Sequence, residues 1–247
     1  MLAVNQVRKI YGIKGTVALN RVSVSFQKGE IVGLLGENGA GKSTLIKAIF
    51  GFISTNSGEI LLDGEKIGPN NIEKLAFATS EHSFFGGLTP LEHKEFYQSQ
   101  FPNFKEKRFD TLLEFFELPK KKQLKYYSTG QKNQFEVILA LSQGAEYIFM
   151  DEPFAGNDIF NREDFYKVLL GILGDDECLV ISTHLIEEIK HFLSRVVLLH
   201  KGHIIGDTTT MELEEQNIDL MEYLKSNYSY KANRVMEVLM QNEKGEE

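Results

Sequence analysis

A glycine-rich run between Gly36 and Thr44 constrains the fold of this chain more than any other feature. It fits the pattern G-x-x-x-x-G-K-[ST], and the short apolar stretch Ile31 to Leu35 precedes it. A buried strand that leads through such a loop into a helix directs backbone N–H groups at phosphate oxygens, and the lysine neutralises their charge. A structural turn would need neither the Lys-Ser pair nor the strand. We therefore expect a nucleotide phosphate here, held by Gly36, Asn38, Gly39, Ala40, Gly41, Lys42, Ser43 and Thr44, with the Ser43 hydroxyl available to Mg²⁺.

Two adjacent carboxylates end a second apolar run. Asp151 and Glu152 directly follow Tyr147 to Met150. We expect Asp151 to hold Mg²⁺ through water and Glu152 to polarise the attacking water, a contribution of about 10²–10⁴-fold to the rate. Two ordinary carboxylates at a strand end would give the same pattern. Together with the phosphate loop, however, the pair favours nucleotide hydrolysis.

The order of apolar segments predicts a single α/β domain over residues 1–247. Apolar residues alternate with serines from Val22 to Phe26, which indicates a half-buried strand in an antiparallel N-terminal sheet. Later apolar strands, at Leu179 to Ile181 and Val196 to Leu199, are separated by segments long enough for helices. This alternation predicts a mainly parallel sheet.

Two further segments have a helical pattern. Strand signals fade between about residues 82 and 135, and many phenylalanines recur there among polar residues. We interpret this segment as a helical subdomain inserted into the α/β core. Residues 208–247 are expected to form a helical tail.

Composition narrows the class of protein and its partners. Of the 247 residues, 42% are apolar and 25% are charged, so disordered and fibrous classes are excluded. The net charge of −8 would repel a phosphate backbone, and we expect no nucleic-acid partner. A single cysteine, Cys178, excludes an internal disulfide and a multi-cysteine zinc site, which suits the reducing cytoplasm. No apolar run is long enough to cross a bilayer, and residues 1–12 lack the apolar block of a secretory signal.

The stretch Tyr127 to Gln131 indicates a particular family of nucleotide-binding proteins. Tyr-Ser-Thr-Gly-Gln resembles the L-S-G-G-Q signature of ATP-binding-cassette (ABC) proteins, with Tyr127 in place of Leu and Thr129 in place of the first Gly. Ser128, Gly130 and Gln131 match signature positions that grip phosphate in the family. A helix N-cap at Ser128 would account for the same local sequence.

The resemblance extends from Tyr11 to about Asp207 and implies the fold and the ligands. It implies a P-loop NTPase fold with a RecA-like α/β core, an N-terminal antiparallel β-sheet and an inserted α-helical signature subdomain, with ATP and Mg²⁺ as cofactors. Tyr11 matches the aromatic that stacks on adenine, although a strand tyrosine would look the same. His184, just beyond an apolar strand, resembles the switch histidine that contacts the γ-phosphate.

The resemblance also implies partners. Cassettes of this family pair head to tail with a second cassette, identical or a sister chain, and they dock on a separate transmembrane permease subunit. The chain would then lie in the cytoplasm, peripherally on the inner face of the cell membrane. The loop Gly156-Asn157-Asp158 resembles the one that carries signals between two facing cassettes, with Asn157 where Leu is usual.

The largest departure from the family lies at Ala78-Thr79-Ser80-Glu81, where a glutamine that touches Mg²⁺ is usual. Spacing from Leu88-Thr89 puts Ser80 at that position. Glu81 is the longer polar side chain beside it, and we expect Glu81 to serve as the metal-side residue. The next segment, Ser83 to Leu88, places Phe84 and Phe85 in a glycine-flexed loop, which predicts a docking groove for the permease, unless these rings fill the subdomain core.

Two other functions fit parts of the pattern. A soluble ABC ATPase that acts on ribosomes or chromosomes usually carries two cassettes or long coiled-coil insertions, and this sequence has neither. A P-loop GTPase would need an Asn-Lys-x-Asp stretch, which is absent. The 37 residues after Thr210 are too few for the regulatory barrel that many sugar-importer cassettes carry, which favours an exporter. We expect an ATP-hydrolysing transporter subunit.

Overall fold

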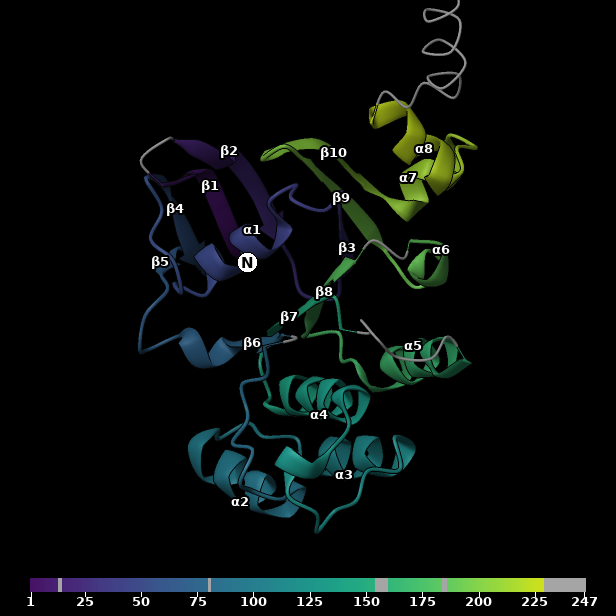
Figure 1. Cartoon of the computed structure of the whole chain (residues 1–247). Coiled ribbons are helices and arrows are strands. Elements are labelled where there is room, and N and C mark those ends of the chain that lie inside the picture. The colour runs from purple at the N-terminus through teal and green to yellow at the C-terminus, as the bar shows by residue number, and fades with distance from the viewer. Residues whose placement is uncertain (13–14, 80, 154–159, 184–185, 229–247) are drawn as a thin grey trace, which may run out of the picture.

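The computed structural model describes residues 1–12, 15–79, 81–153, 160–183 and 186–228, and they form two β-sheets and a group of helices (Figure 1). The strands are β1 (Leu2–Tyr11), β2 (Thr16–Phe26), β3 (Ile31–Leu35), β4 (Ser57–Leu62), β5 (Glu65–Lys66), β6 (Leu75–Ala78), β7 (Tyr147–Asp151), β8 (Cys178–Thr183), β9 (Arg195–His200) and β10 (His203–Thr209). The α-helices are α1 (Lys42–Ile49), α2 (Pro90–Gln100), α3 (Glu106–Phe115), α4 (Thr129–Ser142), α5 (Phe160–Ile172), α6 (Ile186–Ile189), α7 (Thr210–Glu215) and α8 (Leu220–Asn227).

The larger sheet has six strands in the order β10-β9-β3-β8-β7-β6. All neighbouring pairs are parallel except β9 and β10, which form an antiparallel hairpin. Strands β3, β7 and β8 are almost entirely buried, as their continuous apolar sequences predict. The predicted mainly parallel α/β core is therefore confirmed. Because parallel strands end at one edge of a sheet, this order brings the ends of β3, β7 and β8 together.

The smaller sheet has four strands in the order β2-β1-β4-β5, all antiparallel. It confirms the antiparallel N-terminal sheet. Helix α1 packs between the two sheets, where Ile46 shares one buried cluster with Leu2, Phe26, Leu34 and Phe149. The phosphate loop is thereby attached to a rigid core on both sides.

Helices α2, α3 and α4 lie between β6 and β7 in the sequence and extend away from the sheets (Figure 1). Thr89 begins α2 with a capping box, in which its hydroxyl accepts from the Glu92 N–H while the Glu92 carboxylate accepts from the Thr89 N–H. Buried rings and leucines hold the three helices together, among them Phe109 of α3 and Phe135 of α4. The inserted α-helical subdomain of the predicted fold is present.

A buried ion pair fastens this subdomain to the core. The Arg108 guanidinium of α3 forms two hydrogen bonds with the Glu177 carboxylate, at 2.7 and 2.8 Å, just before β8. Lys105 adds a third contact to Glu177 at 2.9 Å. Burial acts to raise the pKa of Glu177. Hydrogen bonds from Arg108, from the Gly174 N–H and from Lys105 outweigh this effect, and the pKa lies below its ordinary value.

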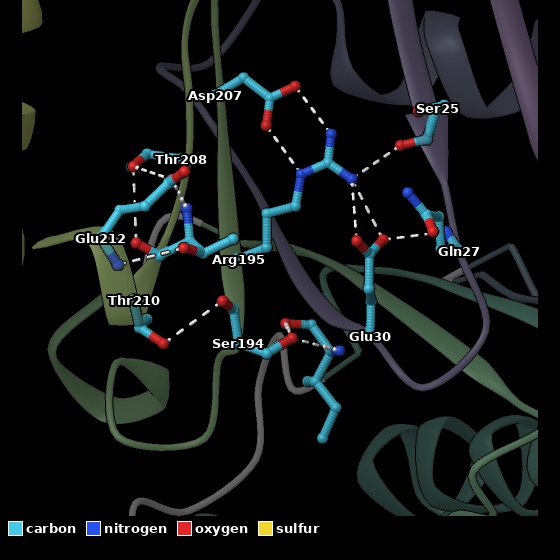
Figure 2. Close-up of polar contacts among 11 residues, drawn as sticks. Ser25, Gln27, Glu30, Ser194, Arg195, Asp207, Thr208, Thr210 and Glu212 are labelled. Atoms are coloured by element: carbon cyan, nitrogen blue, oxygen red, sulfur yellow. Dashed lines mark hydrogen bonds and ion pairs between the residues drawn. The ribbon is translucent and has the colours of Figure 1, made fainter.

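A second arginine joins the two sheets (Figure 2). Arg195 of β9 binds both carboxylate oxygens of Asp207 on β10, at 2.7 and 2.8 Å, and its third nitrogen lies 3.1 Å from Glu30. The same nitrogen donates to the Ser25 carbonyl of β2 at 2.9 Å. The bidentate pair with Asp207 fixes the guanidinium group, and its bond to the Ser25 carbonyl then links β9 to β2 of the smaller sheet.

The described residues contain no helix that is both long and apolar enough to cross a membrane.

Candidate active site

The phosphate loop follows β3 and leads directly into α1. Gly41, which precedes the helix, has a φ of 113°, and a Cβ there would lie 2.6 Å from the Ala18 carbonyl oxygen. A Cβ on Gly36 would lie only 2.4 Å from the Leu199 carbonyl oxygen. Both positions therefore require glycine, because any other side chain would force the loop away from β2 and β9. The glycine pattern is a consequence of how closely the loop approaches these strands.

Lys42 points back into its own loop. The side chain is buried, and its Nζ donates to the carbonyl oxygens of Gly36, at 2.7 Å, and Glu37, at 3.3 Å. Both acceptors are neutral carbonyls, so these hydrogen bonds leave the positive charge of the ammonium group uncompensated at the loop. Such a group is ready to donate hydrogen bonds to phosphate oxygens.

The loop and the carboxylates line one cavity of about 190 Å³. Its walls are Ala18, every residue from Asn38 to Thr44, Asp151 and Glu152. The structure thus brings together the phosphate loop and the two carboxylates, which lie more than 100 residues apart in the sequence. A hydroxyl from Ser43 and a carboxylate from Asp151 are hard oxygen donors of the kind that Mg²⁺ prefers, and they fit the metal.

Two hydroxyl groups of β8 orient the carboxylates of β7. Ser182 Oγ donates to Asp151 Oδ1 at 2.8 Å, and Thr183 Oγ1 donates to Glu152 Oε2 at 3.3 Å. Sequence analysis did not assign these roles. The sequence did contain a sign of these contacts: the apolar run of β8 ends in two hydroxyl residues, Ser182 and Thr183. In a parallel sheet these hydroxyls lie at the same edge as the carboxylates that follow β7.

Glu152 has a strained backbone. Its φ of 49° lies in the left-handed region, and its N–H donates to the Ser182 carbonyl at 2.8 Å. A residue other than glycine in this region costs about 1–3 kcal/mol and persists where the surroundings hold it. The bond to Ser182 supplies that hold, and it keeps the Glu152 side chain at the cavity wall.

The segment after β6 places Glu81 away from this cavity. The Glu81 carboxylate accepts from Lys47 Nζ of α1 at 3.0 Å, and the side chain is largely exposed to solvent. Glu81 is not among the residues that line the cavity. Its metal-side role stays a prediction, and Ser80 lies outside the described residues.

The signature stretch begins α4. Ser128 is the N-cap and forms a capping box, in which its Oγ accepts from the Gln131 N–H at 3.2 Å and Gln131 Oε1 accepts from the Ser128 N–H at 3.1 Å. The helix-cap interpretation is therefore confirmed. Ser128 and Thr129 are exposed, and neither they nor Gly130 and Gln131 line the cavity of the phosphate loop. Any contact with phosphate must come through an exposed helix N-terminus.

The remaining candidates lie apart or outside the described structure. Tyr11 ends β1 with a ring 40% exposed, and Lys9 Nζ lies 5.0 Å from its centroid. Tyr11 does not line the cavity, so its contact with adenine stays a prediction. His184 and the loop from Gly156 to Asp158 lie outside the described residues.

Comparison with known proteins agrees with this geometry. A family model described as ABC transporter matches residues 19–155, more than half of the chain. The chain is 29% identical to ABC transporter ATP-binding protein YtrB of Bacillus subtilis (strain 168), over 89% of this chain and 76% of that protein. It is 31% identical to the SkfA peptide export ATP-binding protein SkfE of the same organism, over 87% of this chain and 92% of that protein.

A solved structure of the ATP binding subunit of an ABC transporter has the same fold, with a TM-score of 0.77 and 24% identity over 88% of this chain and 93% of that one. This likeness confirms the predicted P-loop NTPase architecture. With the family match and the assembled phosphate loop and carboxylates, it follows that this chain belongs to the ABC transporter family as an ATP-binding and ATP-hydrolysing subunit.

Proposed function

We propose that the chain hydrolyses Mg²⁺-bound ATP in the cavity between its phosphate loop and the ends of β7 and β8. The single observation that supports this most is that Lys42, Asp151 and Glu152 meet around one cavity. Lys42 exchanges its loop carbonyls for oxygens of the β- and γ-phosphates, and Ser43 and Asp151 hold the metal. When bound, Mg²⁺ neutralises charge that develops on the phosphate oxygens.

Glu152 orients the attacking water and accepts its proton. The Thr183 hydroxyl holds Oε2 of this carboxylate, and a carboxylate at the cavity wall is within reach of a water that attacks the γ-phosphate. Because the strained backbone of Glu152 is bound to β8, the carboxylate is positioned before ATP arrives. We assign His184 to the γ-phosphate on the resemblance to the family.

A second cassette completes the site. Ser128 and Gly130 begin an exposed helix and do not line the chain's own phosphate cavity. Donors at such a helix N-terminus suit the γ-phosphate of ATP bound to another copy or a sister chain. Closure around two ATP molecules and reopening after hydrolysis would supply the mechanical step.

The permease docks beside Phe85. This ring is 57% exposed and contacts the 39% exposed ring of Phe96 edge to face, with centroids 5.6 Å apart. Lys125 N donates to the Gly86 carbonyl at 2.7 Å, which brings the 62% exposed Tyr126 into the same region. Phe84 instead packs against Phe135 of α4. One ring therefore fills the subdomain core, and the other is available to a partner.

The direction of transport is proposed to be export. Support comes from the name of SkfE, a peptide export protein that aligns over most of both chains. The chain would act at the cytoplasmic face of the membrane through its permease, and the cargo would be selected by that permease.

Membrane pull-downs from cells that contain the whole transporter test this function. We expect Phe85→Ala to release the chain from membranes, with the affinity falling by roughly 2 kcal/mol, while its thermal melt stays unchanged. Phe84→Ala is the matched control, and it should lower the melting temperature because it removes a packed ring. A wild-type chain that sediments with ribosomes or DNA and never with a membrane protein would contradict the transporter role.

A further inference from the structure

Helix α4 carries a buried carboxylate, Glu136, among apolar residues. Glu136 is only 2% exposed, and its neighbours in the helix include the buried residues Phe135, Val137 and Ile138. Burial raises the pKa of Glu136, although hydrogen bonds from Ser83 act in the opposite direction. A buried carboxylate is unfavourable unless it is well hydrogen-bonded, so its partners show what it holds.

Those partners belong to the segment between β6 and α2. Ser83 donates twice to Glu136, from its backbone N–H to Oε2 at 2.9 Å and from its hydroxyl to Oε1 at 2.7 Å. One turn earlier on α4, Asn133 Oδ1 lies 2.7 Å from His82 Nε2. Residues three apart lie on the same face of a helix, so this face of α4 fastens two consecutive residues of the segment.

The two residues after Ser83 are anchored as well. Phe84 packs edge to face on Phe135, with centroids 5.6 Å apart. The Phe85 N–H donates to Nε2 of the buried His93 at 3.0 Å, and Nδ1 of that ring lies 2.9 Å from the Thr89 carbonyl. The exposed Phe85 is therefore held by His93 of α2 and, two residues earlier in the chain, by the attachment of Ser83 to Glu136.

The other end of the segment leads to the catalytic strand. Ala78, the last residue of β6, pairs with Met150, which directly precedes Asp151. Glu136 and Glu152 also line one small cavity of about 10 Å³, together with Thr79 and Asn133. This space is about large enough for one water molecule. Glu136, on the helix that Ser128 begins, thus contacts the segment that carries Phe85 and shares a cavity with the catalytic carboxylate of Glu152.

We propose that Glu136 is a positioning residue for ATP hydrolysis: by holding Ser83 it makes residues 82–85 and the signature helix α4 move as one body. This inference rests on the proposed function. A permease that displaces Phe85 would then shift α4 and its N-terminal Ser128, and the second ATP site would respond. In the other direction, a movement of Ser128 when ATP binds would shift Phe85, where the permease is proposed to dock.

The chemistry of the position supports a role beyond packing. An apolar residue at this position removes the desolvation cost of the buried carboxylate, and the donors of the exposed Ser83 can bond to water instead. A leucine at position 136 would fill much of the same space, but it could not accept hydrogen bonds from Ser83. Stability and positioning are therefore separable by mutation at this site.

Steady-state ATP hydrolysis by the purified full-length chain tests the proposal, with thermal melts on every variant. We expect Glu136→Leu and Ser83→Ala to lower kcat about 10-fold or more while KM for ATP changes less than about twofold, since the phosphate loop is untouched. Glu136→Gln should retain most of kcat, because its amide oxygen still accepts from Ser83. Combining Ser83→Ala with Glu136→Leu should cost no more than the worse single change.

Ser142→Ala is the matched control. Ser142 is also fully buried on α4, and its hydroxyl has no hydrogen-bond partner among the described residues, so kcat should be unchanged. A folded Glu136→Leu variant with wild-type kcat would overturn the inference and leave the proposed function standing. Equal loss in the Gln and Leu variants with lowered melting temperatures would overturn it too. A wild-type chain that hydrolyses no ATP would overturn the proposed function together with the inference.

Discussion

Ser182 donates a hydrogen bond of 2.8 Å to Asp151 across two neighbouring parallel strands, and this contact orients the carboxylate that faces the phosphate loop. Groups that hold a metal ligand commonly change metal affinity by about 10–100-fold, so we expect this hydroxyl to affect the proposed binding of Mg²⁺ by Asp151. The bond joins β7 to β8 at the edge where the phosphate loop begins.

Ser182→Ala should therefore raise the Mg²⁺ concentration needed for half-maximal ATP hydrolysis by about 10-fold. ATPase assays across a range of Mg²⁺ concentrations at saturating ATP measure this shift. Ser99→Ala, an exposed serine on α2, is the control and should leave the curve unchanged. An unshifted curve for Ser182→Ala would show that Asp151 is oriented without it.

Glu152→Gln should keep the affinity for ATP and lose roughly 10²–10⁴-fold in turnover, because only the proton acceptor is removed. The amide still accepts from Thr183, so the backbone geometry should persist. Size-exclusion chromatography with ATP should then show an accumulated dimer. Near-normal phosphate release would mean that another base, such as His184, does this work.

Glu81→Ala should raise the Mg²⁺ requirement if Glu81 leaves Lys47 and approaches the metal during the cycle. Lys47→Met should have the opposite effect, since it removes the competing cation. Neither change should alter thermal stability measurably, because an exposed ion pair contributes little, about 0–1 kcal/mol. Activity and Mg²⁺ dependence unchanged in Glu81→Ala and also in Ser80→Ala would show that this loop has no metal-sensing role.

Glu177 should make stability depend on pH. Its pKa is lowered in the folded chain, so its contribution is fully present above the ordinary value of 4.5 and is lost as the pH falls through the folded value. Denaturant titrations below pH 5 should show this loss in the wild type.

Glu177→Gln removes that pH dependence and leaves Arg108 with a neutral partner. At pH 7 the variant should lose roughly 3 kcal/mol of unfolding free energy, because the guanidinium is mostly buried. Glu114→Gln is the control, since the pair of Glu114 with Lys120 is exposed and should contribute little. An equal loss in both variants would indicate that the Arg108 pair does not hold the subdomain.

The sequence predicted those elements that depend only on residues close together in the chain. The phosphate loop, the strand that ends in Asp151 and the cap at Ser128 each follow from turn residues, apolar runs and capping side chains within a few positions. The expectation for Phe84 and Phe85 left two outcomes open, since two adjacent rings look alike in sequence. Their packing separates them, with Phe84 against Phe135 and Phe85 exposed.

The sequence by itself determined that this chain binds nucleotide in an α/β fold, because backbone geometry dictates where glycines, a lysine and strand-end carboxylates must stand. Only the tertiary structure decided that Ser182 orients Asp151, that Glu81 pairs with Lys47 and that Glu136 holds Ser83. Each of these contacts joins residues more than 30 positions apart. No local rule relates such residues, and their meeting depends on strand order and on how the helices pack against the sheets.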